Sequence, residues 1–163
     1  MDLKKLKAIL VTTFWKQNAW HKHGVLVHSL RVTWELFKKG HYKMLMAGLL
    51  HDIGKPLVAF QKPADIKRGE YSFTDHEEAS YNVIKNWWFI SDYTKTLVRY
   101  HYLIRDMDLG LKKGNGRYEL KKPIWDSLDD KMKEDLRLFL ECDDLGKGTD
   151  FDEVMAKRKA EKK

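Results

Sequence analysis

The segment Leu49-Leu50-His51-Asp52-Ile53-Gly54-Lys55-Pro56 decides how the rest of the sequence is interpreted. It closes an apolar run that starts at position 44, Gly54 is typical of a left-handed helix C-cap, and Pro56 prevents the helix from continuing. We therefore expect His51 and Asp52 in the last turn of a buried helix over about 41–53. Their lone pairs and the negative end of the helix dipole suit a cation. The alternative is a buried histidine–aspartate hydrogen bond that only caps the helix.

Length and composition indicate one globular domain. The chain has 163 residues, of which 43% are hydrophobic, so it is long enough for a core and too apolar for a disordered chain. We expect a single domain over 1–163, with a core over about 18–147 and a C-terminal tail over 148–163. The net charge of +7 favours anionic partners such as nucleotides, although part of it lies in the basic tail.

The sequence also predicts a cytoplasmic protein. Its one cysteine, Cys142, excludes an intramolecular disulfide and is typical of a reducing compartment. We expect no membrane partner, because no apolar run approaches spanning length and no signal peptide opens the chain.

Apolar residues at helical spacing predict six helices. Their approximate ranges are 3–15, 25–38, 41–53, 75–89, 92–102 and 129–145. Thr74 is the expected N-cap of the fourth helix, in a capping box with Glu77, and Ser91 is the expected N-cap of the fifth. Gly146 is expected to end the sixth helix. The residues after it are expected to form a frayed helical tail.

Two segments lack a clear period of apolar residues. Residues 60–74 are mixed, with a short extended piece expected over 70–73. Residues 105–123 are polar and contain three glycines, so we expect a flexible loop or small hairpin over the site. Basic residues on this loop are candidates for guiding a nucleotide, although a solvated basic loop is the simpler interpretation: Arg105, Lys112, Lys113 and Arg117.

Five of the helices carry a histidine or an aspartate on or beside an apolar face. These residues are His28, His51, Asp52, His76, His101 and an aspartate at position 143 or 144. Singly, such a histidine is usually a satisfied core residue. Together, buried ionisable groups indicate something that compensates them, and a metal ion does so directly. Histidine and carboxylate without thiolates favour a hydrolytic or oxygen-activating centre. Six ligands are too many for one ion, so two ions are expected.

The order His, His-Asp, His, His, Asp resembles the motif of the HD-domain superfamily of metal-dependent phosphohydrolases. Residues 24–32 resemble the first-histidine helix of that family, and residues 47–55 resemble its His-Asp signature. Three further segments are similar to the HD domain of tRNA nucleotidyltransferases: 18–28, 71–80 and 141–147. The nucleotidyltransferase head domain is not recognisable, so the resemblance implies hydrolysis without CCA addition.

The resemblance implies an all-α fold, an HD-domain helical bundle of five core helices plus peripheral helices. It also implies one or two divalent metal ions, with the identity open among Mn, Ni, Co, Fe, Mg and Zn. The implied ligands are His28, His51, Asp52, His76, His101 and Asp143. Asp52 would bridge two ions. Asp143 is preferred to Asp144 because the family pattern has glycine three residues later, as Gly146 is here.

The implied activity is hydrolysis of a phosphate ester of a nucleotide or a nucleic-acid end, by a phosphomonoesterase or phosphodiesterase. Two ions would activate a water and neutralise phosphoryl oxygens. Besides Asp52, the expected catalytic residues are Lys55, as a phosphate contact, and His21 or His23, as a donor of a proton to the leaving oxygen. The alternatives are a solvated lysine and surface histidines.

Other functions stay open at this stage. A diiron oxygenase, resembling myo-inositol oxygenase, uses the same ligand set but consumes oxygen and releases no phosphate. A metal-dependent nuclease fits the basic charge, although no strand-binding motif supports it. A non-catalytic nucleotide-binding module is also possible in principle, but the complete ligand set argues against it.

Overall fold

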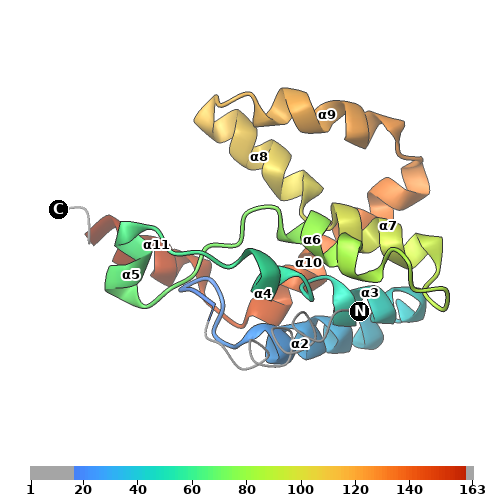
Figure 1. Ribbon diagram of the computed structural model, residues 1–163, viewed down its shortest axis with the longest axis horizontal. Coiled ribbons are helices and arrows are strands. Elements are labelled where there is room, and N and C mark those ends of the chain that lie inside the picture. The colour runs from blue at the N-terminus through green and yellow to red at the C-terminus, as the bar shows by residue number, and fades with distance from the viewer. Residues whose placement is uncertain (1–16, 161–163) are drawn as a thin grey trace.

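The computed structural model describes residues 17–160, and these residues form an all-α fold (Figure 1). The helix predicted over 3–15 lies outside the described residues. Within them, the extended piece expected over 70–73 is reduced to one isolated antiparallel bridge between Phe60 and Ser72. No helix in this part of the chain is long and apolar enough to cross a membrane.

Most of the predicted helices are present, with changed ends. The elements are α2 (Val25–Lys38), the 3-10 helix η1 (Tyr42–Met44), α3 (Leu45–Leu50), α4 (Lys55–Val58), α5 (Pro63–Arg68), α6 (His76–Ile84), α7 (Asp92–Tyr100), α8 (Leu103–Lys113), α9 (Arg117–Ser127), α10 (Asp130–Lys147) and α11 (Phe151–Ala160). The predicted third helix is therefore divided into η1 and α3, and α6 ends earlier than expected. The predicted C-terminal tail contains α11, whose Val154 is buried.

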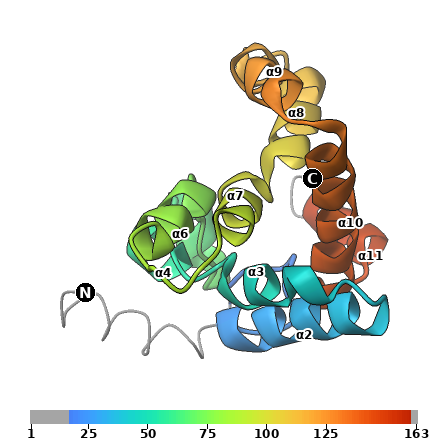
Figure 2. The ribbon, with the colours of Figure 1, turned by 90° about the vertical axis from the view of Figure 1, so that its right-hand side faces the viewer.

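The hydrophobic core lies between α2, α3, α6, α7 and α10. In Figure 2, α2 and α3 lie side by side at the base and α10 rises beside α7. The residues with no exposed surface in this core are Val32, Leu36, Ala47, Ile84, Leu97, Val98, Leu136, Phe139 and Cys142. The α3 helix is not buried on all sides as expected, because Met46 and Leu49 are 45% and 38% exposed.

Gly54 has a different role from the predicted C-cap. Its φ of −86° and ψ of −14° are right-handed helical values, so the left-handed cap is wrong. A Cβ atom at Gly54 would lie 2.2 Å from the backbone nitrogen of Ser80. Glycine is needed here because α4 packs closely on α6. Pro56 lies in the first turn of α4, where its missing N–H is not needed.

The end of α10 also differs from the prediction. The helix continues through Gly146 to Lys147, and Gly148, with a φ of 62°, is the left-handed C-cap. A Cβ atom at Gly146 would lie 2.5 Å from Cγ2 of Val32. Gly146 therefore allows α10 to approach α2.

One predicted N-cap is correct and one is wrong. The Ser91 side chain accepts a hydrogen bond from the backbone N–H of Thr94 at the start of α7, as expected. At the start of α6 the capping residue is Asp75 instead of Thr74, it has a φ of 57°, and it makes no side-chain cap hydrogen bond. The capping box with Glu77 does not form.

Residues 105–123 are helical, so the expected loop is wrong. The antiparallel pair of α8 and α9, which we call the α8–α9 hairpin, extends from the rest of the molecule at the top of Figure 1. Its turn contains Gly114 and Gly116, with φ of 57° and 71°. No residue of α9 is buried, and Pro123 lies inside it. A helix without a buried face leaves no apolar period in the sequence.

Candidate metal centre

The ends of several helices meet above the core and bring all six predicted ligands together. His28 lies in α2, and Asp143 lies in the last turns of α10. The others lie at helix ends: His51 and Asp52 follow α3, His76 begins α6, and His101 follows α7. All six side chains are buried.

Asp52 lies at the middle of this cluster. Its Oδ2 atom is 3.3 Å from Nε2 of His51 and 3.4 Å from Nε2 of His28. Its Oδ1 atom is 3.5 Å from Nε2 of His76 and 3.9 Å from Nε2 of His101. The two oxygens thus face two different pairs of histidines, which is the arrangement that a bridging carboxylate requires.

The structure distinguishes Asp143 from Asp144. Oδ1 of Asp143 lies 2.9 Å from Nε2 of His28 and 3.5 Å from Nε2 of His51. The Asp144 carboxylate instead accepts two hydrogen bonds from the Arg105 guanidinium, at 2.5 and 2.6 Å. Asp143 therefore faces the histidines, and Asp144 does not.

Three of the histidines are oriented by the same kind of hydrogen bond. Each has its Nδ1 atom close to the backbone carbonyl oxygen three residues earlier. The distances are 2.8 Å from His51 to Gly48, 2.9 Å from His76 to Phe73 and 2.7 Å from His101 to Val98. A carbonyl oxygen only accepts, so Nδ1 is the donor and the Nε2 atoms point into the cluster. This second contact is what usually orients a metal-binding histidine.

Burial and the carboxylates shift the pKa values in opposite directions. Burial lowers the pKa of His76 to about 4 and lowers that of His101 well below its usual value. Burial also lowers the pKa of His51, but the charge of Asp52 and the contacts with Asp143 outweigh it and raise the pKa to about 9. His51 therefore holds a proton that a bound cation would replace.

The comparison with protein families now identifies the fold. The family model of the HD domain matches residues 25–138. The chain belongs to the HD domain family. HD domains form a superfamily of metal-dependent hydrolases that bind divalent ions, and the match includes every predicted ligand except Asp143. No curated protein and no solved structure matched the chain. The resemblance to tRNA nucleotidyltransferases therefore stays a prediction.

The donor set of this HD domain fits a divalent ion. Nitrogen and oxygen donors of His28, His51 and Asp143 lie within 4.8 Å of one another, and so do those of His51, Asp52 and His101. Among the described residues, neither carboxylate oxygen of Asp52 accepts a well-aligned hydrogen bond. Burying a carboxylate in this state is costly, and the ammonium of Lys55, 2.6 Å from Oδ2, offsets part of the cost as a bound cation would.

The two other predicted catalytic residues also lie at the centre of the HD domain. Lys55 is buried, so it is not a solvated loop lysine, and its Nζ atom lies 2.6 Å from Oδ2 of Asp52. His21 is partly buried and its Nε2 atom is 3.5 Å from Nζ of Lys55. Burial, followed by the charge of Lys55, holds the pKa of His21 well below 6.5. His21 is therefore neutral at pH 7. His23 does not line the cavity described below.

Sequence reasoning missed two side chains next to these residues. Oε1 of Gln17 lies 2.7 Å from Nζ of Lys55. Oδ1 of Asn18 lies 2.9 Å from Nδ1 of His21. Asn18 stands in the segment that resembles the family's lead-in, whereas no pattern in the sequence marks Gln17.

A cavity of about 530 Å³ opens over the metal centre of the HD domain. Its floor includes Asp52, His76, His101 and Asp143, and its wall includes aromatic and cationic side chains. The aromatic ones are Trp20, Phe73, Tyr102 and Phe151, and the cationic ones are Lys55, Arg105, Lys113, Arg117 and Lys147. Three of the four basic residues proposed for nucleotide guidance thus line the cavity. Lys112 does not.

Proposed function

We propose that this HD domain is a phosphomonoesterase or phosphodiesterase that hydrolyses a phosphate ester of a nucleotide or of a nucleic-acid end. The observation that carries the proposal is Asp52, whose two oxygens face separate histidine pairs on the floor of an open cavity. Divalent ions held there would supply hydroxide from water at neutral pH and neutralise phosphoryl oxygens.

The ligands divide into two overlapping groups. We assign His28, His51, Asp52 and Asp143 to one ion, because their donor atoms lie 2.9–3.5 Å apart. A second ion would be held by Asp52 with His76 and His101, whose Nε2 atoms are 3.2 Å apart. Nitrogen and oxygen donors of this kind accept Mn, Ni, Co, Fe, Mg or Zn.

The wall of the cavity supports an anionic substrate with a flat group. Lys147 is buried beside the centre, with its Nζ atom 3.1 Å from Oδ2 of Asp143. Arg105 is held by Asp144 at the same edge. The rings of Trp20 and Phe151 lie 5.7 Å apart and offer apolar faces to a base. A cavity of about 530 Å³ is in the range typical of small-molecule sites, so it suits a mononucleotide or a strand end.

The catalytic roles follow from these positions. Asp52 would contribute to both ion positions, and the charge of His51 with the buried ammonium of Lys55 keeps its carboxylate ionised. Arg105, Lys113 and Lys147 attract and orient the phosphate ester. The predicted proton donation by His21 to the leaving oxygen is not assigned, because the neutral ring carries its one proton on Nδ1, which donates to Oδ1 of Asn18.

The test is phosphate release by metal-stripped protein resupplied with one divalent metal at a time. The substrates are nucleotides, 2′,3′-cyclic nucleotides and short oligonucleotides. We expect metal-dependent release that falls to the metal-free background in Asp52→Ala. Asp108→Ala, an exposed substitution on α8, is the matched control and should retain activity.

The same assay separates the alternatives. Oxygen consumption with iron and no phosphate release would replace the proposal with the oxygenase. Ion binding without turnover of any substrate would replace it with a binding module. Cleavage confined to internal positions of oligonucleotides would indicate a nuclease.

A further inference from the structure

The side chain of Lys55 is held in a buried group of acceptors at the metal centre. Lys55 is the first residue of α4 and is only 4% exposed. Its Nζ atom lies 2.6 Å from Oδ2 of Asp52, 2.7 Å from Oε1 of Gln17 and 3.5 Å from Nε2 of His21. A buried ammonium is costly unless acceptors surround it, and here three acceptor atoms lie within 3.5 Å of Nζ.

Two of these acceptors also belong to a metal-type donor group. One donor atom each from His21, His28 and Asp52 lies within 4.8 Å of the others. This group shares His28 and Asp52 with the first proposed ion. The imidazole nitrogen of His28 has one lone pair, so His21 and Asp52 are the donors left for a further cation. The ammonium of Lys55 thus lies where a further cation would find nitrogen and oxygen donors.

His21 is oriented like the proposed metal ligands. Its Nδ1 atom lies 2.9 Å from Oδ1 of Asn18, three residues earlier. The same Oδ1 accepts the backbone N–H of Trp20, and Nδ2 of Asn18 donates to the carbonyl of Tyr71. These bonds define which end of the amide faces His21, so Nδ1 is the donor and the Nε2 lone pair points inward.

We propose that His21 and Asp52 form a third cation position beside His28 in this HD domain, and that Lys55 fills it. The lysine then limits the number of divalent ions that the centre accepts. An ammonium brings one positive charge where another divalent ion would bring two, so it neutralises Asp52 with less repulsion towards the neighbouring ions. The proposal rests on the metal centre but not on phosphate-ester hydrolysis.

The test counts ions per chain. Metal-stripped protein is dialysed against Mn²⁺ or Co²⁺ at a known free concentration, and the bound metal is measured by elemental analysis. We expect Lys55→Ala and Lys55→Gln to bind one more ion per chain than the wild type. The visible absorption of bound Co²⁺ should rise in the same proportion. Lys22→Gln, an exposed neighbour of His21, should bind the wild-type number.

The double variant Lys55→Ala/His21→Gln tests the ligand assignment and should return to the wild-type number. The same ion count in the wild type and both Lys55 variants, zero included, would overturn the proposal. A gain that survives removal of His21 would also overturn it. Circular dichroism of each variant confirms that the counts refer to folded protein. If ion counts follow the expectation while no substrate releases phosphate, only the proposed function fails.

Discussion

The metal centre and the α8–α9 hairpin are both helical, but different forces stabilise them. The centre lies directly on the core: the ring of Phe139, which is fully buried, is 5.6 Å from the ring of His51. The hairpin projects from the body (Figure 2), and Leu120 at its middle is 76% exposed. Apolar burial therefore positions the ligands, whereas it contributes little to α9.

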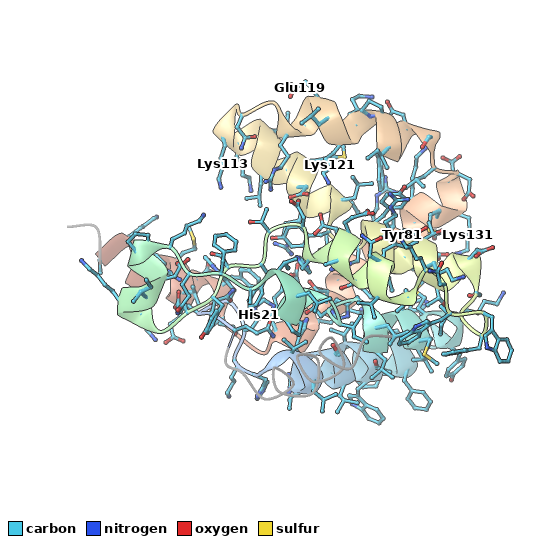
Figure 3. All side chains as sticks on the ribbon, in the orientation of Figure 1. His21, Tyr81, Lys113, Glu119, Lys121 and Lys131 are labelled. Atoms are coloured by element: carbon cyan, nitrogen blue, oxygen red, sulfur yellow. The ribbon has the colours of Figure 1, made fainter. Side chains whose placement is uncertain are left out.

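Ion pairs take the place of a core in the hairpin. The buried carboxylate of Asp106 on α8 lies 2.7 Å from Nη1 of Arg117 and 3.4 Å from Nζ of Lys121, both on α9. Lys121 lies on the side of α9 that faces the body, and Glu119 lies on the opposite side (Figure 3). Lys121 also approaches Glu77 at 3.7 Å, which ties the hairpin to α6. Pairs of this kind weaken in salt, unlike the packing beneath the centre.

The largest difference should come from leucine truncations in the two regions. Leu97→Ala removes a fully buried side chain under the centre and should lower the free energy of unfolding by about 3 kcal/mol. Leu120→Ala removes an exposed one from α9 and should change it by less than about 0.5 kcal/mol. Urea unfolding of both variants measures this. Equal losses of unfolding free energy in the two variants would mean that Leu120 is packed as tightly as the core residue Leu97.

A smaller effect should appear in the pH dependence of stability, which arises from the buried histidines of the centre. The folded-state pKa of His76 is about 4, below its unfolded value near 6.5, so the unfolded chain binds more protons between these values. The contribution of His76 to the stability of the metal-stripped protein should therefore fall as pH drops from 6.5, by on the order of 2 kcal/mol at pH 5, and His101 and His21 act in the same direction. His51, with its pKa near 9, is protonated in the folded state throughout this range and in most unfolded chains below pH 6, so it adds little slope.

The measurement is urea unfolding of metal-stripped protein at pH 7, 6 and 5. His76→Gln should reduce the pH dependence, because the neutral amide does not titrate, while His101 and His21, whose pKa values burial also lowers, keep part of it. Above pH 6.5 the sign reverses, since the stabilisation by protonated His51 is lost as pH rises towards 9. A profile that is flat in the wild type, or unchanged in His76→Gln, would contradict the electrostatic account of the centre.

The smallest effect should be confined to the hairpin. Asp106→Asn removes both ion pairs to α9. The backbone amide hydrogens of α9 should then exchange about fivefold faster, which is equivalent to about 1 kcal/mol. In the wild type, 1 M salt should speed exchange in α9 and leave α7 unchanged. Hydrogen exchange with mass spectrometry resolves the two helices. Unaltered exchange in α9 would show that these pairs do not stabilise the hairpin.

The same contrast explains how much could be predicted from the sequence. Helices with a buried face, such as α2 and α10, were predictable because the 3.6-residue apolar period records their packing. Five of the six candidate ligands were predictable for the same reason, since polar residues such as His28 interrupt buried stripes, whereas the pattern left Asp143 and Asp144 open. The α8–α9 hairpin was not predictable, because ion pairs such as Arg117–Asp106 leave no period.

The sequence by itself determined the all-α class, the family resemblance and the residue types of the centre, because each depends on local pattern and order. Only the tertiary structure decided how segments far apart in the chain meet. It showed that Gly54 is required by the contact with Ser80, and that Asp143 faces the histidines. It also placed the ammonium of Lys55 between Gln17, His21 and Asp52, since distances between side chains of different segments exist only once the chain has packed.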